Sequence, residues 1–350
     1  MSREHFIALD THCVFCEMVT VTKSGKVCCR ERCDTTIPAL LKALEKVPRP
    51  RILTFEEGPM ADWLARSLRP FVDQLIVCNP RRNALIAKES DKDDPIDAER
   101  LAQLLRGGYL KEVHQPQSLE RTILKQHVSY YHDRVRERVR QGHQLTALLR
   151  RHGVFASISD LEGPGERARL WKQLPASRVL RHDLDCLWQV YELLSEQEQE
   201  LRTDLVRLAR REEPVRRFQD VPGIGWIRGV TFYVYIDTPS RFPSKSALHR
   251  YCGIGLERRH SGKGPMRVQL TEGGHRRLKD VLLGAAKSAA GQRDNPFADK
   301  YLYWTKEQGV HPSTARRNVA RCLASTLWSL WKTGNEYNPV WVHGVGITLD

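Results

Sequence analysis

The stretch HFIALDTHCVFCEMVTVTKSGKV, residues 5–27, contains two strands and the start of a third. Residues 5–10 and 14–22 are apolar runs rich in β-branched and aromatic side chains, which favour strands. Ser and Gly at 24–25 form a turn signal before a third run around residues 26–28. The sequence therefore predicts a three-stranded antiparallel meander.

Helices and strands then alternate along the chain. We expect helices over 36–46, 60–68 and 95–105 and short buried strands over 51–57 and 74–80. The order β-β-β-α-β-α-β-α is that of a ribonuclease H-like domain of the α/β class. We assign this domain to residues 1–117.

Long helices are predicted for residues 118–213. An apolar heptad pattern, interrupted once by Glu198, runs through Leu180, Leu184, Leu187, Tyr191, Leu194, Leu201, Leu205 and Leu208. A weaker pattern runs through Leu124, Val128, Tyr131, Val135, Leu145 and Leu149, before a break over 153–175. The two helices could form a hairpin within one chain, or the seam could join two chains.

The third region, residues 214–350, is expected to be mainly helical with glycine turns. It begins near VPGIG (221–225), contains YCGIG (251–255) and closes with an amphipathic helix over 315–331. The tail from 335 lacks a regular pattern. The predicted architecture is thus an α/β domain followed by a helical coiled-coil region and a helical domain.

Charge distribution indicates a polyanionic partner. The chain of 350 residues carries a formal net charge of +14, and residues 241–280 alone hold 10 basic and 3 acidic side chains. Such a concentration of positive charge suits a nucleic acid, because each neutralised phosphate releases counterions. No long apolar run or signal-peptide pattern is present, so we expect a cytoplasmic protein without a membrane partner.

Nine cysteines in such a chain are expected to be reduced thiols. Cys13, Cys16, Cys29 and Cys33 have a spacing near that of a zinc site. Residues 13 and 16 fall in a strand-like run, where positions three apart point to opposite faces. We therefore do not predict zinc.

Acidic residues follow two predicted strands and begin a predicted helix. Asp10 ends the first strand, and Glu56 and Glu57 end the strand over 51–57. Asp94 and Asp97 are three apart at the start of the helix and share one face, although both could simply cap it. Carboxylates that converge repel one another unless cations neutralise them, and a pair of Mg²⁺ ions would assist phosphodiester chemistry. Asp91 and Asp93 are alternatives to the last pair.

Ser261 lies in a cationic, glycine-rich stretch. Its neighbours are Arg258, Arg259, His260, Lys263 and Arg267. Positive charge favours a serine alkoxide and stabilises charge developing on phosphorus, so Ser261 is a candidate nucleophile. Alternatively, the serine contributes one hydrogen bond to a phosphate on a DNA-binding surface.

VPGIG resembles the hairpin of helix-hairpin-helix modules. Gly223 and Gly225 would let backbone N–H groups approach a phosphate closely. A tight turn between helices with no ligand gives the same pattern.

Taken in order, IALD, FEEGP, DPIDA, VPGIG and HSG followed by LTEGGHRRLKDVLLGAA resemble the DEDD transposases of bacterial insertion sequences, the one-ten family of bridge-RNA-guided serine recombinases. The resemblance covers nearly the whole chain. It implies a RuvC-like domain, a coiled coil and a transposase domain in series. Glu57 and the turn EGGH at 272–275 depart from the usual family pattern.

The resemblance implies a division of roles among the residues. Asp10, Glu56, Asp94 and Asp97 would be the metal-binding acids, and Glu56 is preferred to Glu57 because the family acid stands two residues before Gly-Pro. Ser261 would be the catalytic serine. A structured RNA encoded beside the gene would pair with donor and target DNA, while the protein contacts backbone and shape. Nucleic-acid contacts are expected from the following residues: Gly223, Gly225, Arg258, Arg259, His260, Lys263, Arg267, Arg276 and Arg277.

The predicted function is DNA recombination that moves an insertion sequence, at the nucleoid, by a homo-oligomer such as a dimer or tetramer joined through the heptad region. The alternatives are a metal-dependent nuclease that resolves DNA junctions, with Ser261 as a phosphate contact, and a non-catalytic nucleic-acid-binding protein.

Overall fold

A mixed five-stranded sheet forms the centre of the first unit of the chain, Met1–Ser118. The strand order is β3-β2-β1-β4-β5, with β1, β2 and β3 antiparallel and β4 and β5 parallel to β1. The strands are β1 (His5–Thr11), β2 (Phe15–Thr22), β3 (Val27–Asp34), β4 (Arg51–Glu56) and β5 (Gln74–Cys78). The structure is a computed structural model that describes residues 4–80, 94–116, 118–163, 165–259 and 267–343.

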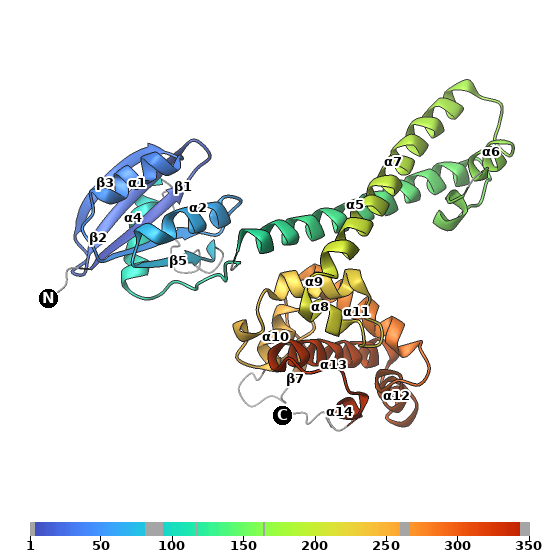
Figure 1. Ribbon diagram of the computed structural model, residues 1–350. Coiled ribbons are helices and arrows are strands. Elements are labelled where there is room, and N and C mark those ends of the chain that lie inside the picture. The colour runs from blue at the N-terminus through green and yellow to red at the C-terminus, as the bar shows by residue number, and fades with distance from the viewer. Residues whose placement is uncertain (1–3, 81–93, 117, 164, 260–266, 344–350) are drawn as a thin grey trace. The chain divides into compact units, whose positions relative to one another are not determined.

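Helices cover both faces of this sheet (Figure 1). Ile7 and Leu9 of β1 pack with α1 (Ile37–Glu45) and α2 (Ala61–Leu68), which is followed by η1 (Arg69–Phe71). On the opposite face, β1 packs against α4 (Asp94–Arg106). The alternation of side chains along each strand therefore divides the core into two layers.

The mixed α/β character of this unit is confirmed, and β3 is longer than predicted. The sequence indicates a third run around residues 26–28, whereas the strand extends from Val27 to Asp34. The segment VCCRERCD lacks the apolar alternation of a buried strand because β3 lies at the edge of the sheet, where charged side chains are favoured.

An antiparallel helical hairpin begins the second unit, Leu119–Asp350. Its long helices are α5 (Leu119–Arg151) and α7 (Arg178–Ala209), joined by η2 (Ile158–Leu161) and α6 (Glu166–Trp171) (Figure 1). The apolar residues of the heptad pattern pack within this chain, either in the hairpin or against the helices that follow. Of the two alternatives for the seam, a hairpin within one chain or a contact between two chains, the structure shows the hairpin.

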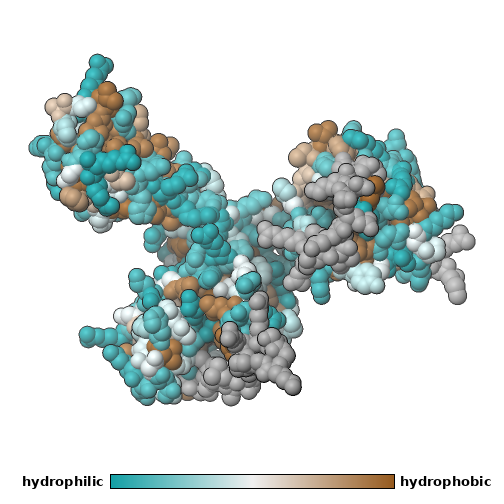
Figure 2. Space-filling view, turned by 180° about the vertical axis from the view of Figure 1, so that it is seen from behind, coloured by the Kyte–Doolittle hydropathy of each residue, from teal (hydrophilic) through white to brown (hydrophobic). Residues whose placement is uncertain are grey.

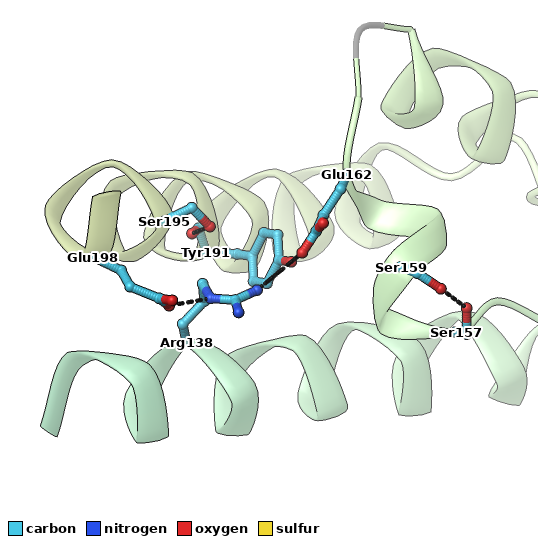
Figure 3. Close-up of polar contacts among 7 residues, drawn as sticks. All are labelled: Arg138, Ser157, Ser159, Glu162, Tyr191, Ser195 and Glu198. Carbon is cyan, nitrogen blue, oxygen red and sulfur yellow. Dashed lines mark hydrogen bonds and ion pairs between the residues drawn. The ribbon is translucent and has the colours of Figure 1, made fainter. Parts of the chain in front are cut away.

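The single polar interruption of the seam has a partner on the other helix. Glu198 accepts a hydrogen bond from Nε of Arg138 at 2.5 Å, and both side chains are more than four-fifths buried. The same guanidinium donates to Tyr191 Oη at 3.2 Å and to Glu162 at 3.0 Å (Figure 3). A charge that breaks the apolar pattern therefore cross-links the hairpin.

The rest of the second unit packs around one apolar core that includes the beginning of α5 and the end of α7. Figure 2 shows mainly hydrophilic residues on the outside of the molecule in that view. The elements are α8 (Glu213–Phe218), α9 (Trp226–Ile236), η3 (Pro239–Arg241), α10 (Lys245–Tyr251), β6 (Leu256–Arg259), β7 (Arg267–Leu270), α11 (Arg276–Ala290), α12 (Pro296–Leu302), η4 (Tyr303–Glu307), α13 (Pro312–Thr333) and α14 (Pro339–His343).

Two details of this unit differ from the prediction. Strands β6 and β7 form a small antiparallel sheet in a region expected to be helices and turns, because LERR and RVQL are too short and too polar to stand out. The short helix α14 lies in a tail expected to be irregular. Within the described ranges, none of the helices is long and apolar enough to cross a membrane.

Candidate functional site

Two of the predicted carboxylates lie near the carboxyl ends of neighbouring strands: Asp10 is the last residue but one of β1, and Glu56 is the last residue of β4. In the parallel pair of β1 and β4, Leu9 lies opposite Phe55, so the next residues, Asp10 and Glu56, are neighbours at the same edge. Side chains alternate along β1, so Asp10 lies on the same face as Ala8, which packs in the core beneath α4. Glu56 lies beside Asp10 on that face. The sheet therefore directs Asp10 and Glu56 toward the face that α4 covers.

The same alternation distinguishes Glu56 from Glu57. Glu56 is the last residue of β4, whereas Glu57 follows the strand and donates its backbone N–H to the carbonyl of Cys78 at 2.9 Å. Successive side chains of an extended chain point to opposite faces. Glu56, and not Glu57, thus shares the face of Asp10.

A histidine orients the Asp10 carboxylate. Nε2 of His12 lies 3.0 Å from Oδ2 of Asp10, whose side chain is 29% exposed. The His12 ring stacks on Phe15 with centroids 4.6 Å apart, and the guanidinium of Arg32 lies 3.6 Å from the centre of the Phe15 ring. We had not predicted His12, although its position two residues after Asp10 puts it on the same face.

A further carboxylate lies directly across the sheet from Asp10. Glu17 of β2 pairs with Asp10 in the antiparallel register and is 9% exposed. One of its oxygens lies 3.5 Å from the guanidinium of Arg32 on β3, its partner in the next strand. The turn at residues 24–25 sets this register, so the hairpin itself was the signal that could have identified Glu17.

The helical pair of acids is only partly described. Helix α4 begins at Asp94, whose side chain lies outside the described residues, as do Asp91 and Asp93. Asp97 is half exposed and lies 3.7 Å from the guanidinium of Arg100 in its own helix. The cap interpretation and the metal interpretation of Asp94 both stay predictions.

Two of the described side chains have the chemistry that could hold a hard cation. Asp10 and Glu56 offer carboxylate oxygens at one sheet edge, which is the chemistry that Mg²⁺ prefers. Among the described residues, no three His, Cys, Asp or Glu side chains come together as a metal site, so Asp97 does not complete a trio with the two strand residues. A divalent ion here would need a further carboxylate, for which Asp94 is the predicted residue and Asp91 and Asp93 are the alternatives.

The cysteines of the first sheet have the character of ordinary thiols. Cys16 of β2 and Cys33 of β3 lie opposite each other, and Cys13 is exposed. Burial is the main cause that raises the pKa of Cys33 to about 11, and burial also raises the pKa of Cys16. Both thiols are therefore protonated at neutral pH.

The segment that carries Ser261 connects β6 and β7. Ser261, His260 and Lys263 lie outside the described residues, and the side chains of Arg258, Arg259 and Arg267 are not described either. The backbones of residues 259 and 267 are paired, which brings the two ends of the serine segment together. The structure thus places the two ends of the serine segment next to each other on the β6–β7 sheet.

Glycines allow backbone segments to approach each other closely beside the β6–β7 sheet. Gly274 has φ +86°, and a Cβ there would lie 2.5 Å from the Cα of Gly253. A Cβ on Gly255 would lie 2.8 Å from the Cα of Arg250. Backbone atoms are therefore in direct contact at these two positions, and no side chain fits there.

Arg277, one of the predicted nucleic-acid contacts, bonds within the protein. It donates to Tyr235 Oη and to Asp133 Oδ1, each at 2.7 Å, and also to Ser129 Oγ. The arginine thereby ties α11 to α5, a structural role that the sequence did not indicate. Arg276 is exposed and stays a candidate contact.

The two glycines of VPGIG have different surroundings. Gly223 has φ +82°, and a Cβ there would lie 2.4 Å from the carbonyl oxygen of Ala285, so close packing on α11 requires this glycine. Gly225 precedes α9 as its N-cap without a side-chain cap, and a Cβ there would meet no atom within 4 Å. Only Gly225 has the open surroundings expected for a ligand contact.

Comparisons with known proteins identify the family to which the whole arrangement belongs. A DEDD transposase model described as "Transposase" matches residues 7–154, and a model described as "Transposase IS116/IS110/IS902 family" matches residues 215–302. The chain belongs to the IS110 family of DEDD transposases. The predicted family and the prediction of an enzyme acting on DNA are thus confirmed.

Two relatives of this transposase agree with the assignment. The y4pF/y4sB protein of Sinorhizobium fredii, whose name describes it as a transposase, is 24% identical over 304 residues, which cover 85% of this chain and 77% of the relative. The transposase for insertion sequence element IS1111A of Coxiella burnetii is 21% identical over 262 residues, which cover 71% of this chain and 69% of the relative.

Proposed function

We propose that this transposase moves its insertion sequence by cleaving and rejoining DNA through Ser261, with Mg²⁺ held by Asp10, Glu56, Asp94 and Asp97. The observation that carries the proposal is the adjacency of Asp10 and Glu56 on the sheet face covered by α4, the helix that begins at Asp94. The strand order of the sheet supports a RuvC-like, ribonuclease H-like domain.

In the proposed reaction, Oγ of Ser261 loses its proton and bonds to the phosphorus of the scissile phosphodiester. The bond from phosphorus to one deoxyribose oxygen breaks, that oxygen takes up a proton to become a hydroxyl, and the strand stays attached as a phosphoserine ester. The hydroxyl of the partner strand then attacks the same phosphorus and releases the serine. Arginines that flank Ser261 would stabilise the negative charge that develops on the phosphoryl oxygens.

The residues of the first unit would hold and orient the metal. Mg²⁺, when bound, would neutralise charge on the attacking and leaving oxygens. His12 already holds one oxygen of Asp10, which leaves the other oxygen of that carboxylate for a cation. Glu17 is engaged by Arg32, so its charge is partly balanced where it faces Asp10.

The proposal includes further partners that rest on the resemblance. Donor and target DNA would be paired by a structured RNA from the same element, which would supply the sequence specificity. Strand exchange requires at least two active sites, hence a homo-oligomer. Because the heptad seam is largely buried within one chain, contacts between chains would involve other surfaces.

Incubation of the full-length protein with donor DNA, target DNA and the candidate RNA tests the chemistry. We expect Ser261→Ala and Asp10→Asn to abolish the recombinant product, and we expect the parent protein to yield a protein–DNA adduct that survives denaturation. A full-rate product from Ser261→Ala would contradict the serine mechanism. A Mg²⁺-dependent nick without any adduct would instead indicate the alternative, hydrolysis by a metal-dependent nuclease.

A further inference from the structure

One face of α7 is hollowed near its C-terminal end. The hollow has a volume of about 500 Å³. Its lining residues are Gln199, Arg202, Thr203, Val206, Arg207 and Arg210. Their spacing of three and four residues places them all on one face of the helix, which we call the α7 groove.

The α7 groove is positively charged. Its three arginines, Arg202, Arg207 and Arg210, are exposed, and no acidic residue is among its lining residues. Arg207 lies 2.9 Å from Asp204, but both side chains are about half exposed or more, so the pair is too weak to withhold the arginine from a stronger partner. Two exposed acids border the N-terminal end of the groove: Glu196, one turn before Gln199, and Glu200, which follows it.

The spacing of these arginines suits a nucleic-acid backbone. Arg202 and Arg210 are eight residues apart, which is about 12 Å along an α-helix. One strand of a double helix carries a phosphate about every 3.4 Å along the axis. Because the strand also winds around the axis, a straight groove of this length can contact about two or three successive phosphates.

The C-terminal end of the α7 groove adjoins the beginning of α9. The guanidinium of Arg210 lies 5.5 Å from the ring centre of Trp226, the first residue of α9. Gly225, the N-cap before it, lies in open surroundings. The positive end of the helix dipole of α9 thus continues the cationic surface of the groove.

We propose that the α7 groove binds the phosphate backbone of duplex DNA. The inference rests on the DNA substrate of the family and not on Ser261 or the carboxylates, so it can fail or hold independently of the proposed chemistry. The arginines and the N-terminal N–H groups of α9 would contact phosphates without reading bases. Their role would be to position the duplex, while sequence is selected elsewhere.

Duplex DNA binding by the full-length protein, measured by fluorescence anisotropy from 50 to 200 mM salt, tests the proposal. The variant replaces Arg202, Arg207 and Arg210 by alanine. Its matched control replaces three exposed arginines at the far end of the hairpin, which removes the same charge: Arg151, Arg178 and Arg181.

Three lost phosphate contacts should reduce the slope of log affinity against log salt by about 2.7. Over this salt range, the affinity of the parent protein would then fall about 40-fold more than that of the groove variant. The control should keep the parental slope. A variant with lysine at the three groove positions should also keep it, because each lysine retains the charge.

Equal slopes for the groove variant and its control would overturn the proposal, since they would show only an effect of net charge. Loss of binding to the structured RNA alone, with duplex binding intact, would also overturn it. Circular dichroism checks that the alanine variant keeps its helices, as expected for substitutions that raise helix propensity.

Discussion

The hydrogen bond between Glu198 and Arg138 leads to a quantitative prediction about the stability of the helical hairpin. Both side chains are less than one-fifth exposed, and the hydrogen bond between them is 2.5 Å long (Figure 3). Glu198→Gln keeps the shape of the side chain but removes its charge. A charged hydrogen bond of this kind contributes about 1.5–3 kcal/mol, so we expect the free energy of unfolding of the second unit to fall by about 2 kcal/mol.

Arg138 keeps two partners in the variant, Glu162 and Tyr191, which limits the loss. A unit of this size loses about 2–4 °C of melting temperature for each kcal/mol, so the transition should move down by about 4–8 °C. Thermal unfolding followed by circular dichroism gives the shift. Hydrogen exchange with mass spectrometry should locate the loss of protection in α5 and α7.

A double-mutant cycle decides whether the two residues act as a pair. Arg138→Met combined with Glu198→Leu should restore most of the stability, because an apolar pair of similar volume replaces a buried ion pair at little or no cost. The exposed pair of Asp204 and Arg207 is the matched control, and Asp204→Asn should change stability by about 1 kcal/mol or less. Additive effects in the cycle would refute the explanation of the polar interruption.

Three further predictions concern a turn, a carboxylate and acid stability. Gly223→Ala should destabilise the second unit by about 1–2 kcal/mol or more in urea unfolding, whereas Gly225→Ala should have little effect; similar losses for both would contradict the packing explanation. Glu56→Gln should reduce recombination with donor, target and RNA far more than Glu57→Gln, and the reverse order would show that the alternation argument is wrong. Burial lowers the pKa of three histidines to about 4, so they are neutral in the folded chain and protonate near pH 6.5 when it unfolds. The free energy of unfolding should therefore fall as the pH drops from about 6.5 to 4, by up to about 1.4 kcal/mol per pH unit for each histidine. Replacing one of them by asparagine should flatten that slope in urea titrations, and an unchanged slope would contradict the assignment. The histidines are His132, His249 and His275.

Strands and helices with strong apolar periodicity could be predicted from the sequence. The opening meander, the strand that ends in Glu56 and the long helices α5 and α7 occur where the patterns indicated. The edge strand β3 and the β6–β7 sheet could not be delimited, because their side chains are polar and their pairing partners set their extent. Local pattern carries little information about such strands.

Candidate residues at strand ends were easier to find than the residues that surround them. Asp10 and Glu56 follow apolar runs and could be read directly. His12 and Glu17 depend on the hairpin register, and the internal bonds of Arg277 depend on helices distant in sequence. Whether the heptad seam joins two helices or two chains is likewise a tertiary property, which a one-dimensional pattern leaves open.

The close backbone contacts of Gly255 and Gly274 bear on how copies of this insertion sequence lose activity. Because main chain meets main chain there, no compensating side-chain change nearby can restore the fit once either glycine is lost. A genomic copy with a bulkier residue at one of these two positions would be expected to have an inactive serine segment even if every acid and the serine were intact. Inspection of these two codons would therefore help to distinguish copies that can still move from inactive copies.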